Sequence, residues 1–334
     1  MNPVSVLVTI VNYRTAELTI DAIASLEAEV VARGDTHVVV VDNGSADGSA
    51  EKIGAAISAR GFARWCTLHA VERNGGFAAG NNEGLACYQA LVGDSRALPD
   101  FVWLLNPDTI ARPDAIGGLV RFMEAHPKVG IAGGRCFWED GRVRSSAFYF
   151  HSPRSELVAG LAFGPATRLL GGREIGIPPD DRPIQADWVS GSSFMIRRAV
   201  IETIGLMDER YFLYFEEEDY CARAADAGFT CWSVPESRIV HIGGQSTGLT
   251  GPARLRRRRP RYWFAARGRF FLRRHGLART HLANGLWLLA YPIGEFIGLA
   301  RKDPRRESPR LWWDFLYSYY GPGGLMYHAR ELGA

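Results

Sequence analysis

Phe101–Thr109 reads FVWLLNPDT, and the rest of the chain is best interpreted outward from this stretch. Its first five residues are apolar and uncharged, a pattern typical of a short strand buried on both faces of a parallel sheet. Pro107 has no backbone N–H, so strand pairing is expected to end there. Asp108 then lies at the carboxyl end of a central strand, where open α/β sheets bind ligands and where a carboxylate suits a hard cation. Asn, Pro and Asp are equally typical of a plain turn, so this stretch alone leaves both interpretations open.

Strand and helix patterns alternate around this stretch. Further apolar, β-branched strands are expected at 4–11, 37–41, 67–71 and 129–133, and helices at 16–30, 46–60, 76–91 and 113–126. The alternation contains no hairpin signal, which predicts a mostly parallel α/β sheet with helices on both faces.

The pattern weakens in residues 138–187, which are rich in Gly, Pro and Arg. We expect a loop-rich excursion or a short antiparallel extension there. Order returns with an apolar stretch at 187–197, a helix ending near Gly205, a helix after an acidic run, and a strand at 230–234.

The composition changes again near Gly251. From Arg254 to Arg274 there are ten arginines and no acid, interleaved with aromatic residues. We therefore expect two domains: a catalytic domain at residues 1–251 and a helical extension, rich in arginine and aromatic residues, at 252–334.

Composition limits the class of protein. The chain has 334 residues, 47% of them hydrophobic, and a net charge of +3, so it folds around a sizeable core and is not a polyanion-binding protein by charge alone. Its five scattered cysteines include no CxxC pair, a pattern typical of buried thiols in a reducing compartment. The apolar run at 4–11 is too short for a signal peptide or a membrane span, so we predict a cytoplasmic protein.

Polar residues follow the first two predicted strands. Asn12 and Tyr13 end the first strand, and Asp42 ends the second. An aspartate there can accept a hydrogen bond from a nucleotide base or a ribose, and Tyr13 can cover a planar base. A turn followed by a helix cap explains either strand end alone. Together with Asp108 at the same edge of the sheet, they favour a shared nucleotide site.

The glycine turn at 74–80, NGGFAAG, lacks the G-x-G-x-x-G spacing of a dinucleotide fingerprint. A backbone turn through Asn74 and Gly76, leading to Asn81, still allows close approach to a phosphate or a sugar. A tight strand-to-helix turn explains the same residues equally well.

Four adjacent acids, Glu216–Asp219, follow the aromatic stretch YFLYF. Mutual repulsion raises the pKa of some members of such a run, as a general base requires, whereas a solvated helix start is the simpler interpretation. His241 ends an apolar strand later in the chain, and it is a candidate for a further metal ligand beside Asp108.

Taken together, these stretches resemble the family 2 glycosyltransferases of the GT-A fold, in particular the rhamnosyltransferase-like branch that builds bacterial cell-surface polysaccharide. The similar segments lie in order between Val4 and Thr247 and read VTIVNYRT, VVVVDNGSADGS, RNGGFAAGNNEG, WLLNPDT, DWVSGSSFMIRR, GLMDERYFLYFEEEDYCARAADAGF and PESRIVHIGGQST. The resemblance implies a nucleotide-diphosphate-sugar donor, with dTDP-rhamnose favoured, a divalent Mg²⁺ or Mn²⁺ ion, and inversion at the anomeric carbon. The implied acceptor is a glycan or a polyprenyl-diphosphate-linked glycan.

The resemblance also implies roles for individual residues. Asp42 would bind the donor base in a pocket lined by Asn12 and Tyr13. Asn106 and Asp108 occupy the family's DxD motif, with Asp108 and His241 as metal ligands. Trp188 and Gly191 would lie near the donor sugar and the acceptor.

Two positions depart from the family pattern. Asn106 replaces the first acid of the DxD motif, so a single strong carboxylate would hold the metal. Glu217 replaces the aspartate that deprotonates the acceptor hydroxyl, which leaves both Glu217, favoured by its position, and Glu216 as candidates for the base.

The arginine- and aromatic-rich segment allows several interpretations. It is typical of a basic helix packed by its aromatic residues, but also of a surface that docks on the anionic inner leaflet of the cell membrane. Residues 261–263 are alternatively placed to cap the donor diphosphate. Nucleic-acid binding is disfavoured because the arginines lie beside an apolar, tryptophan-rich tail. Residues 281–300, interrupted by Pro292 and Glu295, favour surface association over a membrane span.

Two other functions compete with sugar transfer. A nucleotidyltransferase also uses an α/β fold and an Asp-bound metal, but it normally needs a glycine-rich, basic signature after the first strand, where this chain has Asn12, Tyr13 and Arg14. A carbohydrate- or lipid-binding scaffold with a decayed site is favoured mildly by Asn106 and opposed by the acidic run and His241.

Overall fold

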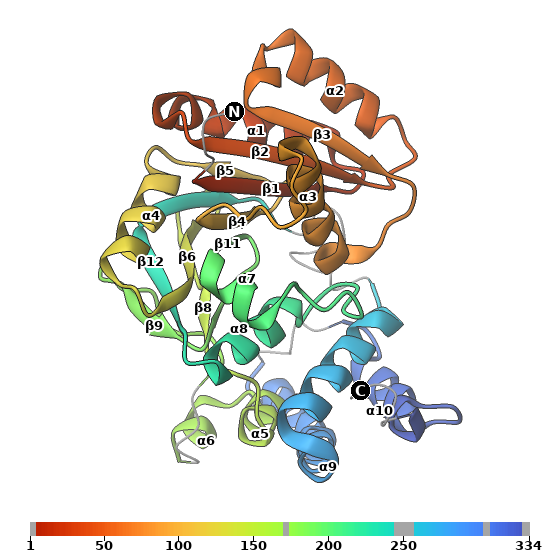
Figure 1. The fold of residues 1–334 in the computed structure, drawn as a ribbon. Helices are drawn as coiled ribbons and strands as arrows, with labels where there is room; N and C mark the ends of the chain where they lie inside the picture. Colours follow the sequence, from red (N-terminus) through yellow and green to blue (C-terminus); the bar gives the residue numbers. More distant parts are fainter. Residues whose placement is uncertain (1–4, 170–173, 244–256, 303–307, 329–334) are drawn as a thin grey trace. The chain divides into compact units, whose positions relative to one another are not determined.

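The computed structural model describes residues 5–169, 174–243, 257–302 and 308–328. These residues form two compact units, coloured along the chain in Figure 1. Unit 1 comprises Met1–Phe148, Ile177–Phe212 and Glu216–Ser246, and unit 2 comprises Tyr149–Gly176, Leu213–Phe215 and Thr247–Ala334. Unit 2 thus contains two segments from the interior of the expected catalytic domain, because those segments pack on the C-terminal helices.

Unit 1 is an α/β unit built on one large sheet. Its strands are β1 (Val6–Asn12), β2 (Thr36–Asn43), β3 (Cys66–Val71), β4 (Phe101–Leu105), β5 (Thr109–Ala111), β6 (Val129–Phe137), β7 (Val143–Arg144), β8 (Ala147–Phe148), β9 (Ile184–Ala186), β10 (Trp188–Val189), β11 (Ser193–Arg197) and β12 (Thr230–His241). Its helices are α1 (Ala16–Arg33), α2 (Ser49–Ala59), α3 (Gly76–Val92), α4 (Ala115–Ala125), α7 (Arg198–Ile204) and α8 (Glu216–Asp226), with a 3-10 turn, η1, at Phe62–Arg64.

The strand order is β3-β2-β1-β4-β11-β6-β12-β5, with β7 paired to β6 and β9 to β12, while β8 and β10 form a separate pair. Strands β3 to β4 are parallel, as the alternation predicts. The expectation of a mostly parallel sheet is confirmed, and the antiparallel exceptions include β11, which lies between β4 and β6, and β5, which pairs with β12. Apolar periodicity marks β11 as a buried strand but carries no information about its direction. Strand β12 is longer than predicted because pairing with β6 resumes after an irregularity around Pro235.

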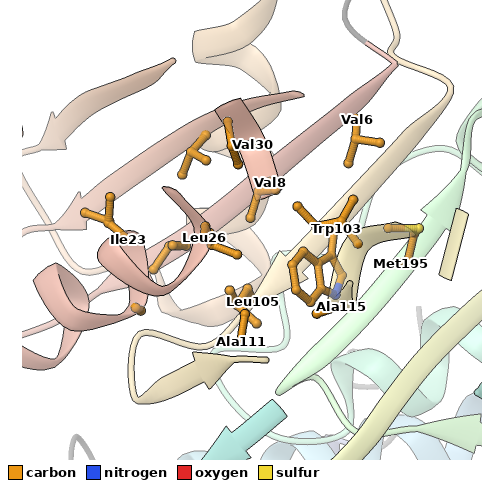
Figure 2. Close-up of a cluster of buried hydrophobic side chains, with 14 of the residues drawn as sticks. Val6, Val8, Ile23, Leu26, Val30, Trp103, Leu105, Ala111, Ala115 and Met195 are labelled. Atoms are coloured by element: carbon orange, nitrogen blue, oxygen red, sulfur yellow. The ribbon is translucent and has the colours of Figure 1, made fainter. Parts of the chain in front are cut away.

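Helices cover both faces of this sheet. On one face, side chains of α1, α2 and α4 pack against alternate residues of β1, β2 and β4. Figure 2 shows Trp103 of β4 in this cluster with Leu26 of α1 and Met195 of β11. The Trp103 indole also donates a 3.0 Å hydrogen bond to Ser193 Oγ, which ties β4 to β11. The fully buried β4 therefore holds the loop that follows it in a rigid frame.

Unit 2 is helical and consists of α5 (Pro153–Leu161), α6 (Gly164–Leu169), α9 (Arg261–Ala300), α10 (Leu311–Tyr320) and a 3-10 turn, η3, at Leu325–His328. Helix α5 lies where loops were expected; Ser152 caps it and Pro153 occupies its first turn, a start signal that the weak periodicity obscured. At Gly276 the backbone leaves helical geometry and divides α9 into two segments.

A buried ion pair joins α5 to α9. Arg267 Nη2 donates to Glu156 Oε2 at 2.8 Å, and Arg267 Nη1 donates to Asn284 Oδ1 at 2.7 Å. The guanidinium lies over the rings of Phe271 and Phe315, so part of the arginine-rich segment forms the core of unit 2. Arg267 is thus packed by aromatic residues, as one interpretation of this segment predicts, but it is 1% exposed and does not belong to a solvated basic helix face.

Within the part of the chain that the structure describes, one helix, α9, is long and apolar enough to cross a membrane by length and composition. Its most apolar window has a mean hydropathy of 1.2, and 28% of that window is buried.

The start of α3 requires glycine at position 76. Gly76 has a φ of +90°, and a Cβ built there would lie 2.0 Å from the carbonyl oxygen of Phe212. That carbonyl accepts a 2.8 Å hydrogen bond from the N–H of Phe77, so the two backbones cannot separate without losing the bond.

We predict that Gly76→Ala lowers the free energy of unfolding by at least about 2 kcal/mol, because the new methyl group meets backbone and the residue must hold a positive φ. Chemical denaturation of the full chain measures the change. Gly54→Ala, a helix position with ordinary space for a methyl group, is the control and is expected to be neutral or stabilising. Equal transition midpoints for Gly76→Ala and the wild type would contradict this account of the turn.

Candidate active site

The ends of β1 and β2 form the first polar corner of the site. In the β1–β2 register Asn12 pairs with Asp42, and the Asn12 Nδ2 donates to Asp42 Oδ1 at 2.6 Å. The hydroxyl of Ser45 donates to the same oxygen, also at 2.6 Å. Asn12 is fully buried and also accepts from Thr15 and Thr19, so its amide fixes the Asp42 carboxylate. Tyr13, partly exposed, follows Asn12 with the Arg14 guanidinium 5.2 Å from its ring centroid.

The glycine turn is held by a second pair of amides. Asn43 Nδ2 donates to Asn74 Oδ1 at 3.0 Å and to the carbonyl of Gly76 at 2.9 Å. Asn74 and Gly76 are therefore fixed beside the end of β2. Asn81 lies elsewhere: it is 4% exposed and bonds Thr9 of β1 and the carbonyl of Phe77, which uses both ends of its amide to hold α3 against the sheet.

Asp108 and His241 form a buried pair. Asp108 Oδ1 lies 3.1 Å from His241 Nε2, with side-chain exposures of 7% and 8%. The ends of β5 and β12 bring them together, since His241 is in register with Thr109. Burial raises the pKa of Asp108, but hydrogen bonds from His241 and from backbone N–H groups outweigh it and hold the pKa below its ordinary value.

The donor atoms at this pair fit a divalent cation in their chemistry and spacing. Asn106 Nδ2 lies 3.4 Å from His241 Nε2, so the amide is close to the pair but would have to turn its oxygen toward a cation in order to bind it. Separations of about 3 Å are those of adjacent ligands around a cation with bonds of about 2.1 Å. Within the described residues there is no group of three or more His, Cys, Asp and Glu side chains that could hold a metal. A cation here would therefore take Asp108 and His241, the neutral Asn106, and oxygens supplied by a ligand.

Arg144, which the sequence analysis did not identify, contacts the far side of the His241 ring. Its guanidinium donates to Nδ1 at 3.1 Å and lies over the ring of Trp138 at 4.4 Å. With Nδ1 as acceptor, the Nε2 proton points at Asp108. A cation at Nε2 would require the proton on Nδ1 and the release of Arg144. Arg144 lies in the segment whose periodicity is weak, so no motif marked it.

A short backbone path connects Asp108 to the acidic run. The N–H of Asn106 donates to the carbonyl of Ser192 at 3.3 Å, and the N–H of Gly191 donates to the carboxylate of Glu217. A Cβ built on Gly191 would lie 3.5 Å from Glu217 Oε1, an ordinary van der Waals contact, so Gly191 borders the carboxyl group closely. Trp188, on β10 of the same segment, stacks on Phe148 with ring centroids 4.2 Å apart.

Glu216 and Glu217 are the first two residues of α8, and their carboxyl groups are only partly hydrogen-bonded. Each has one buried oxygen, Oε2, without a hydrogen-bond partner among the described residues. Burial raises the pKa of Glu217 to about 7, and burial and the neighbouring Glu217 charge raise that of Glu216 well above its ordinary value. Glu216 is only 4% exposed, whereas Glu217 is half-buried and therefore the more accessible of the two.

The next two acids of the run, Glu218 and Asp219, serve the packing of α8. Glu218 and Asp219 are buried, and Asp219 accepts a hydrogen bond from the Tyr211 hydroxyl at 3.2 Å and pairs with Arg223 at 3.0 Å. Immediately before the run, Tyr214 and Phe215 both have a positive φ, which is strained backbone for aromatic residues. The first turn of α8 is thus held in a costly arrangement with two raised-pKa carboxyls.

Comparison with known proteins agrees with this fold and identifies the family. Residues 5–205 match the family model described as Glycosyl transferase family 2. The N-acetylglucosaminyl-diphospho-decaprenol L-rhamnosyltransferase of Mycobacterium tuberculosis is 31% identical over 216 residues, 63% of this chain and 68% of that protein. Rhamnosyltransferase WbbL of Escherichia coli K12 is 25% identical over 169 residues, 50% of this chain and 61% of that protein.

Among solved structures, the mannosyltransferase PcManGT of Pyrobaculum calidifontis, determined with GDP-Man and Mn²⁺, has a TM-score of 0.54 at 16% identity over 90% of this chain and 76% of that one. The architecture is therefore the GT-A fold of nucleotide-sugar glycosyltransferases. The chain belongs to glycosyl transferase family 2, with rhamnosyltransferases among its relatives.

The raised pKa of Glu217 predicts a stability effect that requires no substrate. A carboxyl with a pKa of 4.5 when unfolded and about 7 when folded binds a proton on folding, so its stabilising contribution is complete below 4.5 and is lost as the pH rises through about 7. Glu217→Gln removes this dependence.

We therefore predict that Glu217→Gln and the wild type melt at similar temperatures near about pH 5, and that the variant melts higher near about pH 8. Thermal unfolding at both pH values measures the difference. Glu202→Gln, an exposed position on α7, is the control and is expected to follow the wild type. A Glu217→Gln melting point equal to or below that of the wild type at the higher pH would show that this carboxyl is not destabilised.

Proposed function

We propose that the protein is an inverting, metal-dependent glycosyltransferase that moves a sugar from a nucleotide-diphosphate donor to a hydroxyl of a glycan or lipid-linked glycan. The observation that carries this proposal is the backbone path from Asp108, through Asn106, Ser192 and Gly191, to Glu217. It connects a cation-binding carboxylate and a raised-pKa base in one rigid frame. The names of the relatives favour L-rhamnose, and therefore dTDP-rhamnose, as the donor.

In this proposal the donor base binds at the β1–β2 corner. Asp42, held by Asn12 and Ser45, accepts from the imide N–H of a thymine- or uracil-type base, and Tyr13 covers the ring. The turn at Asn74 and Gly76 approaches the rest of the nucleotide through its backbone. Asn81, which bonds Thr9 and the carbonyl of Phe77, would hold this turn in position.

Asp108, His241 and the Asn106 amide would hold the Mg²⁺ or Mn²⁺ ion, which as a Lewis acid neutralises charge on the departing diphosphate. Arg144 opposes tight binding because it occupies His241 Nδ1. With only one carboxylate ligand, the site is expected to bind its cation with modest affinity until a donor diphosphate adds its own oxygens.

Glu217 would accept the proton of the acceptor hydroxyl. Its buried carboxyl group has a pKa of about 7, near the working pH at which a general base is most effective. Gly191 and Ser192 fix its position, and Trp188 provides an aromatic face nearby for the sugars. Burial, with a smaller contribution from the neighbouring Glu218 charge, raises the pKa of Glu217.

We further propose that the protein works in the cytoplasm and associates peripherally with the inner leaflet of the cell membrane. The second segment of α9 exposes a row of apolar side chains, including Leu289 and Phe296, each 73% exposed. Its opposite face is buried in unit 2 and includes Asn284 and Trp287, which favours lying on a bilayer over crossing it.

The first test is activity. We predict that Asp108→Ala and Glu217→Gln each lower the rate of sugar transfer by several orders of magnitude, about 3–5 kcal/mol of barrier or more, because one loses the cation site and the other the base. Release of free nucleotide diphosphate, with Mn²⁺ or Mg²⁺ and after chelation, measures the loss.

Asp94→Ala, an exposed loop position, is the matched control and is expected to remain active. Near-normal transfer by Asp108→Ala would contradict the metal assignment. A wild type that releases no diphosphate from any donor would instead support a carbohydrate-binding scaffold. A thermal-shift screen of dTDP-, UDP- and GDP-sugars identifies the donor, because binding raises the melting temperature in proportion to affinity.

A further inference from the structure

Unit 2 contains a cationic groove that the proposed chemistry at Asp108 and Glu217 does not use. It has a volume of about 850 Å³ and lies where α9 and α10 begin. Its lining includes Arg258, Arg259, Arg261, Arg310, Trp313 and Tyr317. We call this feature the arginine groove.

The charge of the arginine groove is strongly unbalanced. Among the residues that the structure describes, four arginines line it against a single carboxylate, Asp314, which is 7% exposed and already bound to Arg258 at 2.8 Å. Arg261 and Arg310 are exposed. The groove also receives the N-termini of α9 and α10, whose N-cap residues, Pro260 and Arg310, make no side-chain capping bond. Guanidinium forks and helix N-termini both favour phosphate oxygens.

The same groove exposes large aromatic surface. Trp313 and Tyr317, one turn apart on α10, are 65% and 67% exposed, although other aromatic side chains of α10, such as Phe315, are buried. The indole of Trp312 donates to the carbonyl of Leu288 at 2.8 Å, so α10 begins beside the exposed apolar row of α9. A groove that combines arginines with exposed aromatic side chains suits a ligand in which a phosphate is joined to a hydrocarbon chain.

We propose that the arginine groove binds the diphosphate and the first isoprene units of a polyprenyl-diphosphate-linked acceptor. The arginines take the phosphate oxygens, and Trp313 and Tyr317 contact the hydrocarbon. This inference rests on the proposed function, because it assigns the lipid end of the acceptor to a site separate from the acidic run. A bilayer of anionic phospholipid offers related chemistry but presents single phosphates on a surface and needs no groove.

The test is equilibrium binding of farnesyl diphosphate, a soluble short-chain probe, to the full-length protein. We expect Arg261→Glu and Arg310→Glu each to weaken binding by about tenfold or more, as loss of a charge-assisted hydrogen bond predicts. Arg279→Glu, an exposed arginine on α9 outside the groove, is the matched control and is expected to bind as the wild type does. Arg261→Lys and Arg310→Lys keep the charge but lose the fork, and are expected to show a smaller loss without risk to folding.

The probe series decides between sources of the ligand. Inorganic pyrophosphate and farnesol are each expected to bind much more weakly than farnesyl diphosphate. If pyrophosphate bound as tightly as farnesyl diphosphate, Trp313 and Tyr317 would not contribute to binding. Unchanged farnesyl diphosphate binding by the Arg261→Glu/Arg310→Glu double variant would overturn the site. If the double variant no longer binds phosphatidylglycerol vesicles but still binds farnesyl diphosphate, the groove is a phospholipid headgroup site and the proposal is wrong.

A kinetic comparison separates this inference from the proposed function. The double variant is expected to raise the KM for a diphosphate-lipid acceptor at least about tenfold while hydrolysis of the donor by water stays unchanged. If the wild type hydrolyses no nucleotide-sugar, the proposed function fails, and farnesyl diphosphate binding still tests the groove. If both reactions fall equally in the double variant, the groove does not act on the acceptor.

Discussion

The contact between Asp108 and His241 is the interaction on which the candidate site depends. It lies in the loop that follows β4, which ends at Leu105, and it joins that loop to the end of β12. Because β4 is fully buried and bonded to β11 through Trp103, the loop at 106–108 has little freedom. The imidazole also keeps the Asp108 pKa low, so the carboxylate is charged at neutral pH and ready for a cation.

The acidic end of the site, at Glu216 and Glu217, lowers the stability of the fold. Glu216 and Glu217 each bury an oxygen without a partner among the described residues, and the two residues before them have a positive φ. The strain is tolerated because α8 packs firmly, with Tyr220 and Asp219 buried and Arg223 bonded to Asp219. A carboxyl group with a raised pKa, held by a rigid helix, is what the proposed general base requires.

Much of this arrangement was predictable because it follows from short-range pattern. Apolar runs that are followed by Asn12, Asp42 and Asp108 predict strands with polar residues at their carboxyl ends, and four adjacent acids at 216–219 predict the raised pKa values at the start of α8. The direction of β11 was not predictable, since antiparallel insertion leaves the same apolar pattern. Nor were Arg144 and the segments of unit 2 near α5, because partners distant in sequence decide their positions. Asn81 is a different case: it was expected to bind the donor, but its side chain accepts a hydrogen bond from Thr9 and helps hold α3 on the sheet.

The most direct test of the central claim is anomalous diffraction at the manganese edge from crystals grown with Mn²⁺ and dTDP. The account predicts one manganese peak within bonding distance of Asp108 and His241, bridged to the diphosphate, with the thymine base at Asp42. It also predicts that Arg144 has moved away from His241 Nδ1. A well-ordered nucleotide diphosphate without manganese at Asp108 would contradict the account.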